Sequence, residues 1–321
     1  MTPSISVVMP VWNIKENKLI RSIESILTQT FTDFEFIIVA DEPTKGVQHI
    51  CNQFQRSDSR ITIIYQMERQ GLSRSLNTGI ALAKGKYIAR MDADDISYPT
   101  RLKKQYDFME AHPEVGISGT NHYMDRKGRT YPTFYLTKEG EMNSRSLFGP
   151  VLAHPTVIFR SSFIKNIPGP YDPDFLHAED YELWVRCIGK TKMTNLEEIL
   201  VYIENDGDNV SDRFLAIQEE TAVRIRNIAA SKFGFPVNNG DFVKWLEDLY
   251  STNEEKKIFP QEFFRRELGR YWYFYCLNHR AFNGLSAWKL YRSHPLYKYS
   301  YVSIGMKLKF LGACLIKWRM P

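Results

Sequence analysis

The chain has 321 residues, of which 43% are hydrophobic, and its formal charge is +5. This composition is normal for a soluble protein with a packed core, and the length suffices for one domain with an appendage or for two domains. The N-terminal sequence lacks the features of a secretory signal and no apolar run is long enough to span a bilayer, so we expect a cytoplasmic protein without a transmembrane helix. The four cysteines lack the spacing of a zinc or redox motif, and we expect buried free thiols.

Short apolar runs alternate with stretches of helical periodicity through the first hundred residues. Strands are predicted at 5–11, 34–40, 61–65 and 86–91, and an amphipathic stretch of helical length follows each of them. Fully apolar strands separated by helices indicate a parallel sheet that is covered on both faces. The predicted fold class is therefore α/β, with a mostly parallel, doubly wound sheet.

The pattern changes after Val115. The next segments are predicted as two strands around a turn, a strand that runs into a helix, and a helix, at 116–132, 154–164 and 178–188. A polar loop comes after these elements, and everything from about Arg213 onward has helical periodicity. We therefore predict a first domain at 1–212 and a helical C-terminal region at 213–321.

Polar side chains follow three of the four N-terminal strands. Pro10 to Asn13 close the first strand, Asp41 follows the second, and Asp92 to Asp95 follow the fourth. Ligands of doubly wound sheets bind beyond the carboxyl ends of the strands. We therefore expect these three segments to share one site.

The run DADD, Asp92 to Asp95, admits two interpretations. Carboxylates one residue apart can hold a divalent cation such as Mg²⁺, which completes its octahedron with water and ligand phosphates. Alternatively, the run is a solvated turn in which Asp95 caps the next helix. The sequence has neither a Walker loop nor a G-x-G-x-x-G motif. A metal must then offset the charge of any bound diphosphate, which favours the metal site.

Two further groups of residues each have a structural and a functional interpretation. Glu179 and Asp180 open a predicted helix, where they either complement its dipole or supply a general base at the lip of a cleft. Arg74 and Asn77 open the third predicted helix, where they either meet a diphosphate or belong to a capped, solvated helix end.

Several sequence runs occur in the order found in one enzyme family. These runs are ISVVMPVWN, SIESILTQTFTDFEFIIVAD, GLSRSLNTGIALAKGKYIARMDADD, HPTVIFR and AEDYELWVR. Together they resemble the family-two glycosyltransferases of bacterial glycan biosynthesis, over residues 4–212. The resemblance implies a GT-A, Rossmann-like fold. It also implies the inverting transfer of a sugar from a nucleotide-sugar donor, with UDP favoured, to a hydroxyl of a glycan or a lipid-linked saccharide acceptor.

The resemblance also implies roles for residues that bind the donor. Pro10 and Trp12 would line a pocket for the base, and Asp41 would hydrogen-bond the base. Asp92 would contact the ribose or a metal-bound water. The candidate donor-binding residues are Pro10, Val11, Trp12, Asn13, Asp41, Arg74, Asn77, Asp92, Ala93 and Asp94.

The metal and the catalytic base follow from the same resemblance. Asp94, with Asp92 beside it, would hold Mn²⁺ or Mg²⁺. Asp180 matches the catalytic base, and Glu179 is the candidate catalytic residue next to it. Two other functions stay open: a sugar-1-phosphate nucleotidyltransferase, whose Gly-rich loop is missing, and a nucleotide-sugar-binding scaffold without turnover, against which Asp94 and Asp180 argue.

The chain departs from the family pattern at two places. Ala40 stands where the first of two aspartates is usual, although Asp41 keeps the position of the base contact. After the last core strand, Ile203 and Asn205 replace an arginine and a histidine that many members carry. The loop at 206–213 is instead a candidate to fold over the donor.

The C-terminal region is basic and aromatic. Residues 268–321 carry nine Lys or Arg and no Asp or Glu. Within them, 304–318 present an apolar helical stripe, which is typical of an interfacial helix or of a helix packed on the core. We favour an anionic membrane surface at the inner face of the cell membrane as the partner. We expect no nucleic acid partner, because no nucleic-acid-binding module accompanies the basic residues.

Overall fold

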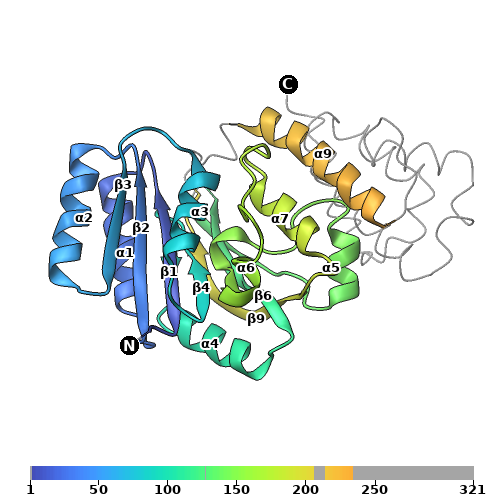
Figure 1. Ribbon diagram of the computed structural model, residues 1–321, viewed down its shortest axis with the longest axis horizontal. Coiled ribbons are helices and arrows are strands. Elements are labelled where there is room, and N and C mark those ends of the chain that lie inside the picture. The colour runs from blue at the N-terminus through green and yellow to red at the C-terminus, as the bar shows by residue number, and fades with distance from the viewer. Residues whose placement is uncertain (1, 127, 206–213, 234–321) are drawn as a thin grey trace, which may run out of the picture. The chain divides into compact units, whose positions relative to one another are not determined.

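The computed structural model describes residues 2–126, 128–205 and 214–233 (Figure 1). The chain divides into two compact units, 1–142 with 150–222 and 143–149 with 223–321. The predicted domain boundary after residue 212 stays a prediction, because 206–213 lie outside the described residues. The same holds for the basic region from residue 268 onward and for its apolar stripe.

The first unit is built on a nine-stranded sheet. Its strand order is β3-β2-β1-β4-β8-β6-β9-β5, and β7 pairs with β6. The four N-terminal strands pair in parallel, which confirms the predicted parallel core: β1 Ile5–Val11, β2 Phe34–Asp41, β3 Ile61–Gln66 and β4 Tyr87–Arg90. Since β1 lies between β2 and β4, the carboxyl ends of these three strands meet at one edge of the sheet.

The other half of the sheet is mixed. β8 pairs antiparallel with both β4 and β6, whereas β9 pairs parallel with β6. The bounds are β5 Ile96–Ser97, β6 Val115–Arg126, β7 Arg129–Thr133, β8 Ile158–Arg160 and β9 Lys192–Ile203. The antiparallel pairing of β6 with β7 confirms the predicted turn at DRKG. The sequence did not predict β5, because two residues are too few to show a period.

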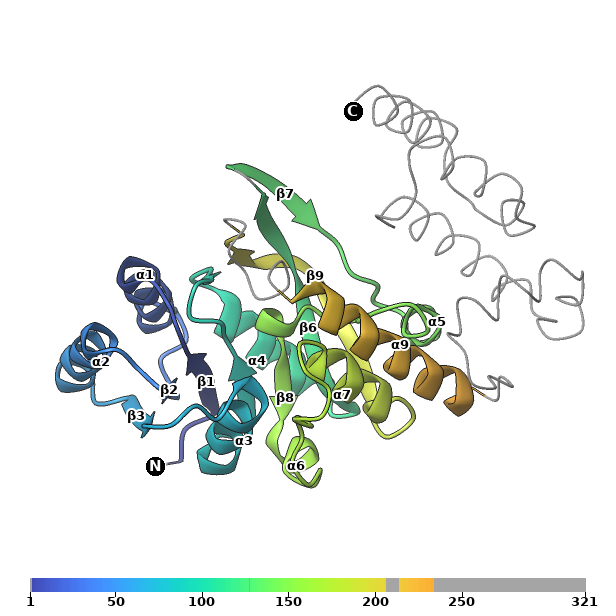
Figure 2. The same ribbon diagram turned by 90° about the horizontal axis from the view of Figure 1, so that it is seen from above.

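Helices cover both faces of the parallel strands. The bounds are α1 Glu16–Leu27, α2 Lys45–Ser57, α3 Leu72–Leu82 and α4 Arg101–Ala111. Alternate residues of β1, such as Val7 and Met9, share one hydrophobic cluster with residues of α1, α2 and α4. On the opposite face (Figure 2), α3 lies close to the sheet at Gly79, where an added Cβ would come within 2.4 Å of Val8 Cγ1.

The remaining elements follow in chain order. Their bounds are α5 Glu139–Arg145, η1 His154–Thr156, α6 Ser161–Ile164, α7 Glu179–Cys187 and α9 Leu215–Lys232. Leu183 and Trp184 of α7 are fully buried.

Two of the four cysteines belong to the described residues. Cys51 and Cys187 are buried free thiols, as predicted, whereas Cys276 and Cys314 lie outside the described residues. Across 2–126, 128–205 and 214–233, the structure contains no helix with the length and hydropathy needed to cross a membrane.

Candidate active site

A cavity of about 520 Å³ lies at the carboxyl ends of β1, β2 and β4. Segments that are far apart in the sequence form its wall. The predicted site residues among its lining are Pro10, Val11, Trp12, Asn13, Asp41, Asp92, Ala93, Asp94 and Glu179. The structure therefore brings together the three strand ends and the start of α7, as expected for a ligand site of such a sheet.

Backbone strain is concentrated around this cavity. Among the described residues other than glycine, a positive φ occurs at Asn13 (43°), Glu42 (49°) and His177 (62°). Asn13 and His177 line the cavity, and Glu42 follows the lining residue Asp41. Left-handed conformations of this kind are unfavourable for side chains with a Cβ and are found preferentially at functional sites.

At one end of the cavity, Asp41 organises a turn. Its Oδ1 accepts a hydrogen bond from Gln70 N at 2.7 Å, and its Oδ2 accepts one from Gly71 N at 2.8 Å. Arg69 Nη1 donates to the same Oδ2 at 3.1 Å. Gly71 has a φ of 85°, which favours glycine. The Asp41 carboxylate thus fixes the turn that leads into α3.

Arg69 connects this turn to the aromatic wall of the cavity. Its guanidinium carbon lies 3.4 Å from the centre of the Trp12 ring, in the range of a cation–π contact. The sequence reasoning did not identify Arg69 as a site residue. The signal that could have found it is Gly71, a glycine directly before a helix, which indicates a tight turn at the edge of the site.

The acidic run after β4 forms a cluster. Asp92, Asp94 and Asp95 each have a carboxylate oxygen within 4.8 Å of the others. Arg90 Nη1 donates to Asp92 Oδ2 at 2.5 Å, and its Nη2 contacts Asp92 Oδ1. Arg90 is only 3% exposed, so this is a buried bidentate pair.

The interpretation of Asp95 as the cap of the next helix is wrong. Asp95 does not cap α4, because that helix begins at Arg101 and its N-cap is Thr100. The Asp95 carboxylate points instead toward the end of β9, where Oδ1 accepts a hydrogen bond from Glu204 N at 3.2 Å. Its Oδ2 is buried and has no hydrogen-bond partner in the described part of the chain.

The electrostatics of this cluster suit a cation. Burial and the charge of Asp92 raise the pKa of Asp94 to about 6. Burial and the charges of Asp92 and Asp94 raise the pKa of Asp95 well above its usual value. A compact set of carboxylate oxygens, one of them buried without a partner, is the donor set that Mg²⁺ and Mn²⁺ prefer. These residues fit a divalent cation.

The start of α7 supplies two more carboxylates. Glu179 is buried and lines the cavity, whereas Asp180 is partly exposed and does not belong to the lining residues. Asp180 Oδ1 accepts a hydrogen bond from Tyr181 N at 2.7 Å. Burial raises the pKa of Glu179 to about 7 and that of Asp180 to about 6. Both values lie near neutral pH, where a carboxylate can exchange a proton efficiently.

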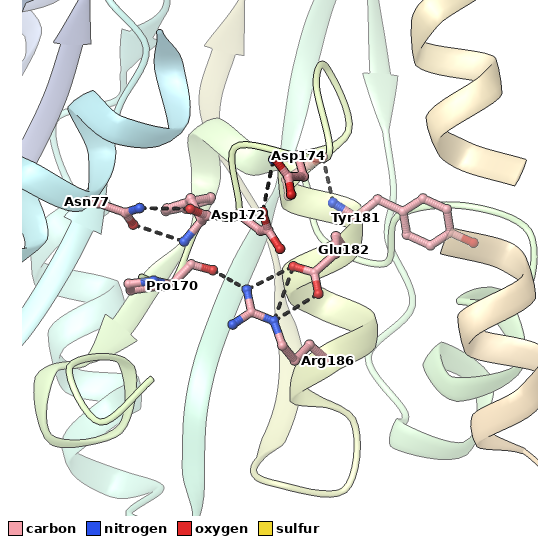
Figure 3. A network of polar contacts seen from close by, with 9 residues as sticks. Asn77, Pro170, Asp172, Asp174, Tyr181, Glu182 and Arg186 are labelled. Carbon is pink, nitrogen blue, oxygen red and sulfur yellow. Dashed lines mark hydrogen bonds and ion pairs between the residues drawn. The ribbon is translucent and has the colours of Figure 1, made fainter. Parts of the chain in front are cut away.

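A polar network holds α7 in place (Figure 3). Arg186 donates from Nε to Glu182 Oε1 at 2.9 Å and from Nη2 to Glu182 Oε2 at 2.8 Å. The same guanidinium also donates to the Pro170 carbonyl oxygen. Asp172 Oδ1 accepts a hydrogen bond from Asp174 N at 2.9 Å, which shapes the loop before the helix.

The structure does not bring Arg74 and Asn77 to this cavity. Arg74 is exposed, because it lies on the opposite side of α3 from the lining residues at the helix start. Asn77 binds the backbone of Tyr171 at both groups: Nδ2 donates to the carbonyl oxygen at 2.8 Å, and Oδ1 accepts from the amide at 2.9 Å (Figure 3). Asn77 therefore fixes the loop that precedes α7.

Further lining residues come from segments that the sequence did not mark. Lys18 of α1 is buried in the wall, and His177 lies beside Glu179. The His177 ring stacks on Phe214 with 4.3 Å between the ring centres. His154, by contrast, is a core residue whose Nε2 lies 2.8 Å from Tyr171 Oη, and burial lowers its pKa well below the usual value.

The fold is shared with solved structures of low sequence identity. Staphylococcus aureus TarS 1-349 in complex with UDP matches with a TM-score of 0.55 and 16% identity, over 98% of this chain and 91% of that chain. The mannosyltransferase PcManGT from Pyrobaculum calidifontis, in complex with GDP-Man and Mn²⁺, matches with a TM-score of 0.52 and 13% identity, over 73% and 75% of the two chains. The fold class is GT-A, as the resemblance implied.

Sequence comparison identifies the family. The family model described as Glycosyl transferase family 2 matches residues 6–167, about half of the chain. Two Escherichia coli relatives agree. The O-antigen biosynthesis glycosyltransferase WbnJ is 32% identical over 69% of this chain and 87% of its own length. The UDP-Glc:alpha-D-GlcNAc-diphosphoundecaprenol beta-1,3-glucosyltransferase WfaP is 30% identical over 60% and 74%. The chain belongs to glycosyltransferase family 2 and is a glycosyltransferase of the kind found in bacterial glycan biosynthesis.

Proposed function

We propose that the protein is an inverting, metal-dependent glycosyltransferase. It would transfer a sugar from a UDP-sugar to a hydroxyl of a glycan or a lipid-linked saccharide. The observation that carries this proposal is that the wall of one cavity includes the Asp41 turn, Asp92 and Asp94 of the acidic cluster, and Glu179 at the start of α7. A nucleotide-sugar donor needs a pocket for its base and a place for its diphosphate. We assign the base to the end of the cavity at Asp41 and the diphosphate to the end at the acidic cluster.

The nucleoside would bind between the first strand end and the Asp41 turn. Pro10 and Trp12 supply an apolar wall and an aromatic face, and the Asp41 carboxylate accepts hydrogen bonds from Gln70 N and Gly71 N. Asp41 Oδ1 accepts one of these hydrogen bonds, so it keeps a lone pair for a base N–H. Asp92, held by Arg90, would face the ribose or a metal-bound water.

The diphosphate end is proposed at the acidic cluster. Asp94 and Asp92 would hold Mg²⁺ or Mn²⁺, and a solved neighbour with this fold contains Mn²⁺. When bound, the cation supplies positive charge that stabilises the departing diphosphate. Burial and the charge of Asp92 raise the pKa of Asp94 to about 6, and a cation would offset that negative charge.

Asp180 is proposed as the general base of a single displacement. Its carboxylate accepts the proton of the acceptor hydroxyl while the hydroxyl oxygen forms a bond to the anomeric carbon. The bond between that carbon and the diphosphate oxygen breaks on the opposite face, and the electron pair leaves with the diphosphate. The configuration at the anomeric carbon therefore inverts. With a pKa of about 6, Asp180 is ionised at neutral pH and still basic enough to take the proton.

The choice of donor and acceptor has support from relatives. The WfaP name specifies UDP-Glc and a diphosphoundecaprenol-linked saccharide, and TarS was solved with UDP. A lipid-linked acceptor would bring the protein to the inner face of the cell membrane. We propose that the basic C-terminal region, which lies outside the described residues, contributes to this attachment.

A panel of nucleotide sugars tests the proposal. The full-length protein is incubated with UDP-, GDP- and dTDP-sugars, with Mn²⁺, with Mg²⁺ or with EDTA, and the released nucleoside diphosphate is measured. We expect slow release from one or more UDP-sugars that requires the cation, because water can replace the acceptor hydroxyl. No release from any donor in the presence of either cation, and no binding of any nucleoside diphosphate, would contradict the proposed function.

A further inference from the structure

The proposed mechanism gives no role to the lysines of the cavity wall. Among its lining residues, Lys15, Lys18 and Arg69 carry a positive charge. Arg69 is engaged by Asp41 and Trp12 at the base end, and Lys15 is exposed. Lys18 is only 7% exposed, so it is the buried cation of this wall.

Lys18 lies next to the acidic cluster. It belongs to the first turn of α1, which follows the β1 strand end, and both Lys18 and Asp94 line the cavity. Ser22, one turn further along α1, donates from Oγ to the Asp92 carbonyl oxygen at 2.8 Å, so this side of α1 packs against the acidic run. The ammonium is therefore at the end of the cavity where the diphosphate is proposed to bind.

Glu204, at the end of β9, links Lys18 to the same cluster. Lys18 Nζ lies 3.5 Å from Glu204 Oε1, whereas Arg21 Nη2 lies 2.6 Å from Glu204 Oε2. The Glu204 amide donates to Asp95 Oδ1 at 3.2 Å, so its backbone is anchored on the acidic run. Arg21 therefore makes the shorter contact with Glu204, and Lys18 makes the longer one.

We infer that Lys18 is a diphosphate-binding residue of the donor site. The inference rests on the proposed function, and it assigns a cation to α1, whereas the residues at the end of β9, Ile203, Glu204 and Asn205, carry no positive charge. An ammonium has three donors, so Nζ can bind a phosphate oxygen while it keeps a contact with Glu204. Lys18 then faces the diphosphate from α1, beside the acidic run after β4, and stabilises it as it departs.

Binding measurements test this role without requiring turnover. The dissociation constants of UDP and of uridine are measured by calorimetry for the wild type and Lys18→Met, with Mn²⁺ and with EDTA. We expect Lys18→Met to weaken UDP binding by about ten- to a hundredfold, the range of one charge-assisted hydrogen bond, and to leave uridine binding unchanged. Because the ammonium carries its own positive charge, which does not depend on the cation, the loss should persist in EDTA.

Three further variants separate ligand binding from packing. Lys18→Arg keeps the cation and should recover most of the UDP affinity. Glu204→Gln removes the negative charge beside the ammonium, so UDP should bind equally or more tightly. Lys45→Met removes an exposed lysine from the start of α2, outside the cavity, and should change nothing. Thermal unfolding shows which variants are folded at the assay temperature.

The outcomes distinguish this inference from the proposed function. If the wild type binds UDP but Lys18→Met binds it equally well, the role of Lys18 is wrong and the proposed function stands. Equal losses for UDP and uridine, or an equal loss in Glu204→Gln, would show a structural ion pair and would also overturn it. If the wild type binds no nucleoside diphosphate, the proposed function fails, and the inference fails with it.

Discussion

Replacing Arg90 with methionine should change both the stability of the protein and the pH dependence of transfer. Arg90 is 3% exposed and forms a bidentate pair with Asp92. Its positive charge also lowers the pKa of four neighbouring carboxyl groups, which belong to Asp94, Asp95, Glu179 and Asp180. Arg90→Met keeps an unbranched, apolar side chain, although a shorter one, and removes the guanidinium with its charge and its hydrogen bonds.

The stability effect follows from the burial of the pair. Removing one partner of a buried ion pair typically destabilises a protein by about 3–5 kcal/mol. The Asp92 side chain is 31% exposed and can rehydrate, so we expect the lower end of this range. For a unit of this size, a loss of 1 kcal/mol lowers the melting temperature by roughly 2–4 °C. Arg90→Met should therefore melt about 6–12 °C below the wild type.

The pH effect has a definite sign. Asp180 acts as a base only when it is ionised, so transfer by the wild type should decline as the pH falls through about 6, the raised pKa of this carboxyl. Arg90 stabilises the ionised form. Without Arg90, the pKa of Asp180 rises further, and the acid limb of the kcat/KM profile moves to higher pH. Arg90→Lys retains the charge and should move the limb less.

A second buried arginine provides the control. Arg101 is fully buried and donates to the Arg90 carbonyl oxygen at 2.7 Å and to Gln105 Oε1 at 3.0 Å. Its charge is not among the causes of the raised pKa values of Glu179 and Asp180. Arg101→Met should therefore destabilise the fold without moving the acid limb. If folded Arg90→Met and the wild type showed the same acid limb, the electrostatic role of Arg90 would be refuted.

Three other predictions address separate parts of the molecule. Asp180→Asn should lower kcat by about 10²- to 10⁴-fold with UDP affinity unchanged by calorimetry, and near-full activity would rule out Asp180 as the base. Asp94→Asn should abolish the part of UDP binding that depends on Mn²⁺, which is measured by titration with and without EDTA. If Mn²⁺ strengthened UDP binding in this variant as much as in the wild type, Asp94 would be excluded as a ligand. Gly79→Ala should lower the free energy of unfolding in urea by about 1–3 kcal/mol, because its Cβ would come within 2.4 Å of Val8 Cγ1. An unchanged urea midpoint would mean that α3 can move away from the sheet.

Much of the fold could be predicted because its signals are local. The four parallel strands are continuous apolar runs, and each following helix shows its own period, so β1 to β4 and α1 to α4 are readable within short windows. The position of β5 is different. Its two residues, Ile96 and Ser97, become a strand only because they pair with Val201 and Tyr202 of β9, more than a hundred residues later. No local pattern contains that information.

The same contrast between local signals and long-range packing explains which site residues could be predicted. Pro10, Asp41 and Asp94 could be predicted because the carboxyl end of a parallel strand is visible in the sequence. Lys18 and Arg69 could not, because their entry into the cavity depends on how α1 and the Asp41 turn pack against those strand ends. Arg74 was a candidate because it is close to a helix start in the sequence. In the structure, the helical repeat turns it away from the lining residues.

The three carboxylates of the DADD run have different partners, and this difference supports the proposed roles. Arg90 holds both oxygens of Asp92, and the Glu204 amide holds Asp95 Oδ1. No side chain of another described residue donates a hydrogen bond to Asp94, which is partly exposed in the cavity and has a raised pKa. Asp94 therefore keeps the most lone pairs for the proposed cation, and Asp92 lies beside it with its position fixed by Arg90. A cation held there and the Lys18 ammonium would both offset the negative charge of the departing diphosphate.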